Sequence, residues 1–117
     1  MTDDVKIDTV RSYTSGTVGR ALNSARTNHF VLDSPSGPNE ALTNGEAFLA
    51  GISSCGVTLI EGYARQHGVP LTGMQVTIEG IRDLAAPNKF QAVKMRFELA
   101  GVGPIQATEL VEVYKSR

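Results

Sequence analysis

Four side chains in this sequence have the types that thiol chemistry requires. Cys55 is the single cysteine of the chain, and it lies in a helical pattern of small and apolar residues that would surround it with a dry, close-packed site. Thiolate is the reactive form of cysteine, and a nearby cation favours it. A helix dipole acts only at the terminal turns, so a mid-helix thiol needs a cation from elsewhere in the fold. Arg20 and Arg26 are the candidates, and Glu46 could hold the guanidinium of either beside the sulfur through a bidentate pair.

Each of these residues also has a structural interpretation. A lone buried cysteine commonly fills space as a small apolar side chain. Arg20 and Arg26 would then be solvated charges on strands, and Glu46 a carboxylate placed at the positive end of a helix dipole. The residues alone leave both interpretations open.

The sequence predicts no metal centre and no cofactor site. His29 and His67 are far apart, and neither has a second ligand three or four residues away. The glycine patterns of phosphate-binding loops do not occur.

Composition predicts one ordinary globular domain spanning residues 1–117. The net charge of -1 gives no reason to expect nucleic acid or an anionic membrane as a partner. No apolar run is expected to reach the roughly 18 residues of a membrane helix. The polar start MTDDVKID is unlike a signal peptide, and one cysteine cannot form an internal disulfide, so we expect a cytoplasmic protein.

Hydrophobic periodicity predicts the elements that position these side chains. Alternation at Val5, Ile7 and Thr9 predicts a first strand, followed by a weaker one over 17–23 and a stronger one over 29–33. A loop rich in proline and asparagine leads to a helix over 45–68, which Thr43 or Asn44 would cap. Further elements are two alternating strands over 74–82 and 90–99, which form a hairpin, and a last helix over 105–117. The expected fold class is therefore α+β, with the central helix covered by sheet.

The run Glu46-Ala-Phe-Leu-Ala-Gly-Ile-Ser-Ser-Cys55, with Gly68-Val-Pro-Leu71 after it, resembles the OsmC/Ohr superfamily of osmotically induced and organic-hydroperoxide-resistance proteins. The stretch His29-Phe-Val-Leu-Asp-Ser-Pro35 and the strand Met74-Gln-Val-Thr-Ile-Glu-Gly80 support the resemblance. It implies antiparallel sheets around a long central helix and an intertwined homodimer with sites shared at the interface.

The resemblance also implies roles for individual residues. Peroxidases of this family attack the peroxide O–O bond with a thiolate on the central helix, while an arginine and a glutamate position and activate that thiol. Cys55 matches the reactive position, and Gly19-Arg20 is similar to the family's glycine–arginine step, with Arg26 close enough to compete. Glu46 is the nearest match for the glutamate, although it lies nine residues before Cys55 and the usual place, ten before, holds Gly45.

The sequence departs from the family in having no second cysteine to resolve the oxidised thiol. The tail Leu110-Val-Glu-Val-Tyr-Lys-Ser-Arg117 is similar to tails that run directly into Cys-Pro. The chain is therefore expected either to be truncated at its C-terminus or to be a one-cysteine member that needs an external thiol reductant.

Three hypotheses follow for function. The first is a thiol-dependent reductase of small organic or hydrogen peroxides. The second is a non-catalytic module that binds a small or lipid-like molecule, and the third is a structural remnant without a site. In each case we expect a homodimer, because so short a chain cannot cover a long apolar helix on all sides, and Gly51, Ser54 and Gly56 would allow a partner to come close.

Overall fold

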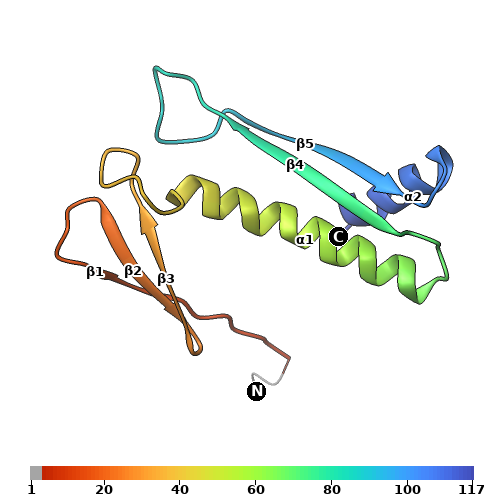
Figure 1. Ribbon diagram of the computed structural model, residues 1–117, viewed down its shortest axis with the longest axis horizontal. Helices are drawn as coiled ribbons and strands as arrows, with labels where there is room; N and C mark the ends of the chain where they lie inside the picture. The colour runs from red at the N-terminus through yellow and green to blue at the C-terminus, as the bar shows by residue number, and fades with distance from the viewer. Residues whose placement is uncertain (1–3) are drawn as a thin grey trace. The chain divides into compact units, whose positions relative to one another are not determined.

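The computed structural model describes residues 4–117 as three strands, a long helix, two strands and a second helix (Figure 1). This α+β order, with antiparallel sheets and a long central helix, confirms the predicted fold class. The chain divides into two compact units, the first ending at Ala47 and the second covering Phe48–Arg117. The elements are β1 Arg11–Thr14, β2 Arg20–Ala25, β3 Asn28–Asp33, α1 Asn44–Gln66, β4 Gly73–Ile81, β5 Ala92–Ala100 and α2 Pro104–Lys115.

The first unit is built on an antiparallel sheet with β2 between β1 and β3. Strands β2 and β3 form a tight hairpin in which Ala25 pairs with Asn28, and Arg26 takes a positive φ of 58° in the turn. The same register brings Arg20, at the start of β2, opposite Asp33, at the end of β3.

The strand predicted around Val5, Ile7 and Thr9 does not form. The register of the β1–β2 pair explains its absence. Arg11 lies opposite Ser24, and β2 ends one residue later, at Ala25. Residues before Val10 therefore have no residue of β2 to pair with. The strand predicted over 17–23 begins only at Arg20, because Thr17–Gly19 form a turn closed by the Arg20 N–H and the Thr17 carbonyl at 3.2 Å.

Helix α1 begins with a reciprocal capping box. The Thr43 hydroxyl accepts the backbone N–H of Glu46 at 3.1 Å, and the Glu46 carboxylate accepts the backbone N–H of Thr43 at 2.9 Å. The helix ends at Gln66, close to the predicted end, and Gly68 follows with a φ of 67°, the left-handed conformation that commonly terminates helices.

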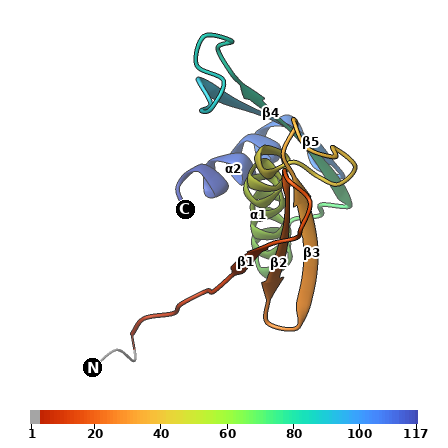
Figure 2. The same cartoon turned by 90° about the vertical axis from the view of Figure 1, so that its left-hand side faces the viewer.

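The core of the second unit lies where α1 meets the β4–β5 hairpin and α2. Its buried apolar side chains are Ile60, Ala64 and Leu110, and Phe97 and Tyr114 pack against them. Figure 2 shows these elements of the second unit grouped together. Because so few side chains are fully buried, each of them has a large share in stabilising this unit.

Contrary to expectation, α1 is long and apolar enough to cross a membrane when judged by length and composition alone. The core helix of a soluble protein passes the same test. Charged side chains of Glu46, Glu61 and Arg65 lie along this helix.

Gly80 of β4 has the ring of Phe90 directly against it. A Cβ at this position would lie 2.6 Å from the Cδ1 atom of Phe90, closer than van der Waals contact allows. The ring cannot move away freely, since the guanidinium of Arg82 lies 4.1 Å from its centroid and Phe48 stacks on it at 6.0 Å.

We therefore expect Gly80→Ala to lower the free energy of unfolding by about 1–3 kcal/mol. Gly73→Ala is the matched control, because Gly73 belongs to the same strand and an added Cβ there meets nothing within 4 Å. Urea denaturation of both variants measures the difference, and equal stabilities would contradict this account of the Phe90 contact.

Candidate functional site

Cys55 lies in the middle of α1 and is exposed in the single chain. This corrects the expectation of a buried cysteine in a close-packed site. Cys55 lines a groove with a volume of about 560 Å³. The other lining residues come from α1 and from the end of the chain: Phe48, Gly51, Ile52, Leu59, Tyr114, Lys115 and Arg117.

Tyr114 fixes one wall of this groove. Its hydroxyl donates to the carbonyl oxygen of Ile52 at 3.3 Å and also lies 3.7 Å from the sulfur of Met95. Its ring passes close to Gly56, where a side chain would touch it at 3.5 Å. Because Ile52 and Gly56 flank Cys55 on α1, these contacts set the distance between α2 and the helix face beside the thiol.

The groove is apolar along α1 and cationic at the end of α2. Phe48, Ile52 and Leu59 supply hydrocarbon surface, while Arg117 and Lys115, which pairs with Glu112 at 3.3 Å, are basic. Sequence reasoning missed this contribution of the last helix. The available signal was the apolar pair Leu110 and Tyr114, four residues apart, which turns the end of that helix towards its neighbours.

In the first unit, Arg20 and Asp33 form a bidentate ion pair. The Arg20 Nε donates to Asp33 Oδ1 at 2.7 Å, and Nη2 donates to Oδ2 at 2.9 Å. Nη2 also donates to the Glu40 carboxylate at 3.0 Å. Asp33 is fully buried, and its Oδ2 further accepts the backbone N–H groups of Glu40 and Ala41, each at 2.9 Å.

These bonds favour the charged form of both partners. The hydrogen bonds to Asp33 and then to Glu40 hold the pKa of Arg20 above its usual range. The hydrogen bonds from Arg20 and the Ala41 N–H hold the pKa of Asp33 well below its usual range, and they outweigh the opposing effect of burial.

Two glycines let the backbone fold around this ion pair. Gly19 has a φ of 86°, and its carbonyl oxygen accepts the Ser34 N–H at 2.7 Å. The backbone of Gly37 passes directly against Gly19, and a Cβ added to Gly37 would lie 2.6 Å from the carbonyl oxygen of Gly19. The sequence therefore places Arg20 immediately after a turn that only glycine fits, which fixes the direction in which its side chain leaves the strand.

The remaining predicted site residues, Arg26 and Glu46, also belong to the first unit. Arg26 is exposed in the β2–β3 turn. The Glu46 carboxylate bonds to Thr43 in the capping box, whereas it was expected to bond to an arginine. Because Cys55 belongs to the second unit, its pairing with either arginine stays a prediction.

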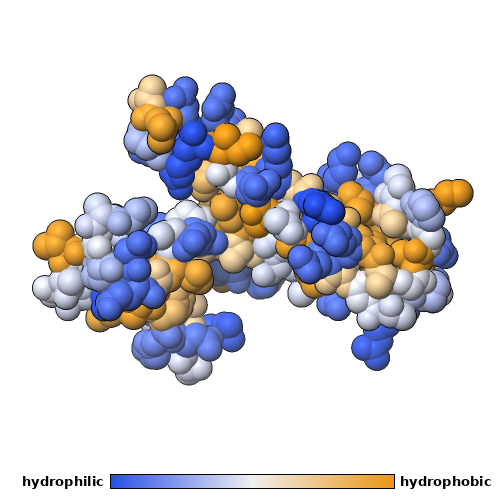
Figure 3. Space-filling view, turned by 45° about the horizontal axis from the view of Figure 1, so that its top comes forward, coloured by the Kyte–Doolittle hydropathy of each residue, from blue (hydrophilic) through white to orange (hydrophobic). Residues whose placement is uncertain are grey.

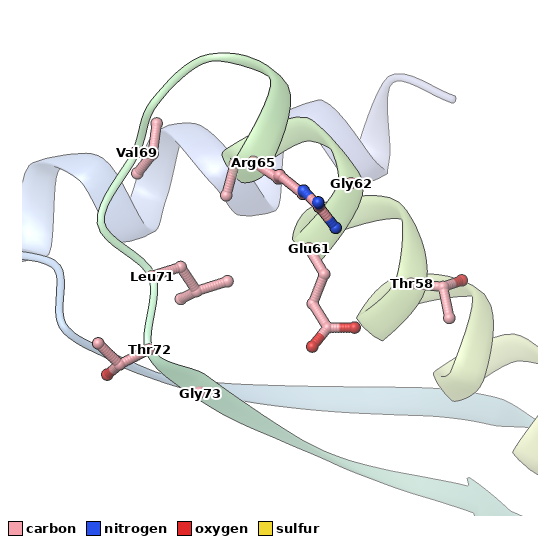
Figure 4. A pocket seen from close by; sticks show the side chains of 9 residues that line it. Thr58, Glu61, Gly62, Arg65, Val69, Leu71, Thr72 and Gly73 are labelled. Atoms are coloured by element: carbon pink, nitrogen blue, oxygen red, sulfur yellow. The ribbon is translucent and has the colours of Figure 1, made fainter.

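A second cavity, of about 640 Å³, lies between the last turns of α1 and the start of β4 (Figure 4). Leu71 and the carboxylate of Glu61 point into this space, and Arg65 lies on the adjoining turn of the helix. Cys55 is not among its lining residues. Within residues 4–117, no group of three or more His, Cys, Asp or Glu side chains is placed to hold a metal ion.

The depressed pKa of Asp33 makes the stability of the first unit depend on pH. A carboxylate whose pKa is lower in the folded state than in the unfolded state stabilises the fold. This stabilisation is complete above the unfolded-state pKa, near pH 4, and it disappears as the pH falls towards the folded-state pKa. We expect Asp33→Asn to have a lower melting temperature than wild type at pH 7, with the difference shrinking between about pH 4 and pH 2. Thermal melts across this range measure it, and a difference independent of pH would contradict the assigned ion pair.

Comparisons with known proteins agree with this architecture. Residues 37–116 match the family model described as OsmC-like protein. A hypothetical protein from Aquifex aeolicus VF5 is similar in structure, with a TM-score of 0.82 and 12% identity over 97% of this chain and 82% of that one. A search of curated proteins gave no match.

Names that mention hydroperoxides occur among the similar structures, and two examples follow. One is an organic hydroperoxide resistance protein from Legionella pneumophila, with a TM-score of 0.68 and 20% identity over 96% of this chain and 84% of that one. The other is the organic hydroperoxide resistance protein OhrB of Bacillus subtilis, with a TM-score of 0.66 and 14% identity over 95% of this chain and 84% of that one. At such low identities, the structural similarity shows a shared fold alone. The match to the family model, over residues 37–116, covers more than half of the sequence. The chain is a member of the OsmC-like protein family.

Proposed function

We propose that this protein reduces organic or hydrogen peroxides with Cys55 as the nucleophile. The observation that carries the proposal is the position of Cys55, exposed beside an apolar groove on the long helix of an OsmC-like fold. An exposed thiol can meet a dissolved peroxide, and a neighbouring hydrocarbon surface can hold the organic part of one.

In the proposed reaction, the Cys55 thiolate attacks the nearer peroxide oxygen and the O–O bond breaks. The balanced step converts Cys–SH and ROOH into Cys–SOH and ROH, so the sulfur is oxidised while the peroxide is reduced. A positive group stabilises both the thiolate and the oxygen that leaves with negative charge. Arg20 or Arg26 is proposed for this role, with Glu46 as a further member of the site at the start of the same helix.

The sulfenic acid must then be reduced by a thiol from outside the 117 residues, because Cys55 is their single cysteine. One external thiol would form a mixed disulfide with Cys55 and release water. A second would regenerate the Cys55 thiol and leave as a disulfide. An external thiol reductant is therefore one proposed partner, and a small peroxide is the other.

The composition of the groove favours organic peroxides over hydrogen peroxide. Phe48, Ile52 and Leu59 offer apolar contacts that an alkyl or aryl group can use and that hydrogen peroxide cannot. We expect cumene hydroperoxide to be consumed with a higher kcat/KM than hydrogen peroxide.

A homodimer is part of the proposal, and exposed apolar side chains support it. Tyr13, Leu22 and Val31 lie side by side across the first sheet and remain 51%, 41% and 36% exposed. In the second unit, Phe48 is 58% exposed. Apolar surface also reaches the solvent at several places on the face drawn in Figure 3. Large apolar surfaces of this kind are usually covered by a partner, and a stable monomer in sedimentation at micromolar concentration would contradict the dimer.

We propose a cytoplasmic location, where thiol reductants are abundant. The net charge of -1 favours neither nucleic acid nor an anionic membrane as a partner.

A peroxide-consumption assay with dithiothreitol as the electron donor tests the proposed activity. With dithiothreitol present, we expect continuous turnover of cumene hydroperoxide at a rate that saturates with substrate concentration. Without dithiothreitol, consumption should stop after about one equivalent of peroxide per protein chain. Consumption no faster than that of dithiothreitol alone would contradict the proposal.

The second candidate function is non-catalytic binding of a small apolar or lipid-like molecule. The apolar lining of the same groove favours it, together with the single cysteine. Native mass spectrometry of protein purified from its own host would show a retained ligand, whereas a clean apo mass would count against this function.

A further inference from the structure

Phe48 lines the apolar groove beside Cys55, and its ring is held by a residue that lies outside the groove. Phe90, in the connection between β4 and β5, stacks on Phe48 with the ring centroids 6.0 Å apart. We propose that Phe90 is a positioning residue, which fixes the ring of Phe48 and thereby sets the preference of the groove for peroxides that carry an aryl group. This inference rests on the proposed peroxidase function and deepens it by assigning a residue that selects the organic group.

The exposure of Phe48 explains why its ring needs support. The side chain is 58% exposed near the start of α1. An exposed side chain changes rotamer freely, and a ligand that needs it in one position must supply the free energy of ordering it. The rings of Phe48 and Phe90 are nearly parallel, with 18° between their planes, and this contact favours the rotamers that preserve it. The groove wall is thus ordered before a ligand arrives.

Arg82 and Gly80 hold the ring of Phe90 in its turn. The guanidinium of Arg82 lies 4.1 Å from the ring centroid, which is a cation–π contact. Nη1 of Arg82 also donates to the carbonyl oxygen of Pro87 at 2.7 Å, so the guanidinium is fixed against the same loop. The ring of Phe90 fills space that is free because Gly80 has no side chain. Phe90 therefore has a defined position although it belongs to a loop.

The backbone beside Phe90 is fixed as well. The N–H of Gln91 donates to the carbonyl oxygen of Ile81 at 2.6 Å, directly next to the last paired residues of the β4–β5 hairpin. Phe90 is therefore one residue away from a bonded ladder, and its Cα cannot drift far from β4. This anchoring lets Phe90 act as a support for Phe48.

The stacked pair lies apart from the core of its unit. All residues of Phe48–Arg117 are described by the structure, and neither ring belongs to the core cluster or to the side chains packed against it. The pair therefore does little to hold α1 on the sheet. The surface that it orders is the groove wall beside Cys55.

An ordered aromatic wall discriminates between organic groups. A phenyl group can stack on the ring of Phe48, or meet it edge to face, and this contact adds to the burial of its apolar surface. A small alkyl group gains the burial alone, and hydrogen peroxide gains neither. The contribution of Phe90 should therefore be largest for aryl peroxides and absent for hydrogen peroxide.

The test uses variants that separate the ring from its bulk. Phe90→Leu keeps an apolar side chain without a ring, and Phe90→Tyr keeps the ring. Arg82→Gln removes the cation from Phe90 and changes an exposed side chain, so it serves as a second variant if Phe90→Leu does not fold. Phe48→Leu and the double variant Phe48→Leu/Phe90→Leu test whether the two rings act together. Leu84→Ala is the matched control, because Leu84 is an apolar residue of the same loop and is 93% exposed.

Two measurements are made on each variant. The first needs no peroxide: 2-phenyl-2-propanol, the alcohol that reduction of cumene hydroperoxide produces, is titrated while iodoacetamide alkylates Cys55. The alcohol concentration that halves the alkylation rate reports how tightly the groove holds an aryl group. The second measurement is kcat and KM for cumene hydroperoxide and for hydrogen peroxide.

We expect Phe90→Leu to raise the half-protecting alcohol concentration about threefold to tenfold, the range that an ordered aromatic contact contributes. For cumene hydroperoxide, kcat/KM should fall by a similar factor through a higher KM, while the value for hydrogen peroxide stays within about twofold of wild type. Arg82→Gln should shift both results in the same direction by less. The double variant should be little worse than Phe48→Leu alone, because Phe90 acts through Phe48. Phe90→Tyr and Leu84→Ala should match wild type.

The inference is overturned if folded Phe90→Leu keeps wild-type protection and wild-type kcat/KM for cumene hydroperoxide. It is also overturned if hydrogen peroxide reduction falls as much as cumene hydroperoxide reduction, or if the alcohol does not protect Cys55 in the wild-type protein. Failure of the proposed function gives a different result. The wild-type protein would then consume neither peroxide, while the alcohol would still protect Cys55 and Phe90→Leu would still weaken that protection.

Discussion

Replacing Cys55 with serine is expected to reduce peroxide consumption by at least about a thousandfold, to the rate of the reductant alone. A serine hydroxyl is almost fully protonated near neutral pH, and its oxygen cannot take up the peroxide oxygen as a sulfur does. The substitution changes one atom at an exposed position, so we expect no loss of stability. Initial rates with cumene hydroperoxide and dithiothreitol measure the effect.

Ser54→Ala is the control for this experiment. Ser54 is the exposed neighbour of Cys55 on α1, but it does not line the groove. Its replacement should leave the rate within about twofold of wild type, because surface changes away from a site have small effects. Residual activity of Cys55→Ser close to wild type would mean that the thiol is not the nucleophile.

The largest effect on stability is expected at Leu110, which should lose about 2–5 kcal/mol of unfolding free energy on replacement by alanine. Leu110 is 2% exposed and belongs to a core of very few buried side chains. The cavity would open in the cluster that also contains Ile60 and Ala64, against which Phe97 and Tyr114 pack. Since small domains are stable by only about 5–15 kcal/mol, this loss would remove a large share of the total and lower the melting temperature.

Ile105→Ala provides the comparison on the same helix. Ile105 is 77% exposed in the single chain, so its truncation should cost under about 0.5 kcal/mol. Denaturant unfolding of both variants at two protein concentrations measures the difference. An equal loss in both variants would contradict the assigned core, and a loss for Ile105→Ala that depends on protein concentration would place this side chain in a dimer interface.

The elements governed by local rules were predictable from the sequence. The apolar stripe of α1, its cap at Thr43 and its stop at Gly68 are set by residues within one or two turns. The β4–β5 hairpin follows from alternation on both sides of a single loop. The first predicted strand failed because strand formation needs a partner, and β2 ends before it can pair with residues 5–9.

The environment of the candidate site depends on contacts that local patterns do not specify. Asp33 lies at the end of the strand predicted over 29–33 and was not among the predicted site residues, yet it is the buried partner of Arg20. Placing the hairpin turn at Arg26 and Thr27 would have revealed the pair, because antiparallel register around that turn sets Arg20 opposite Asp33.

The exposure of Cys55 was also missed, and for a geometric reason. The buried positions of α1 are Gly56, Ile60 and Ala64, which repeat every four residues. Cys55 precedes this stripe by one residue, which turns its side chain about 100° away from the core. The apolar pattern of the sequence was too broad to distinguish these two adjacent faces.

The most direct test of the proposed chemistry is to trap the sulfenic acid on Cys55. Protein treated with one equivalent of cumene hydroperoxide in the presence of dimedone should gain one dimedone adduct, and peptide mass spectrometry should place it on Cys55. The yield should fall when the protein is first alkylated with iodoacetamide. A chain that remains unmodified while the peroxide persists in solution would show that Cys55 is not a peroxide-reactive thiol.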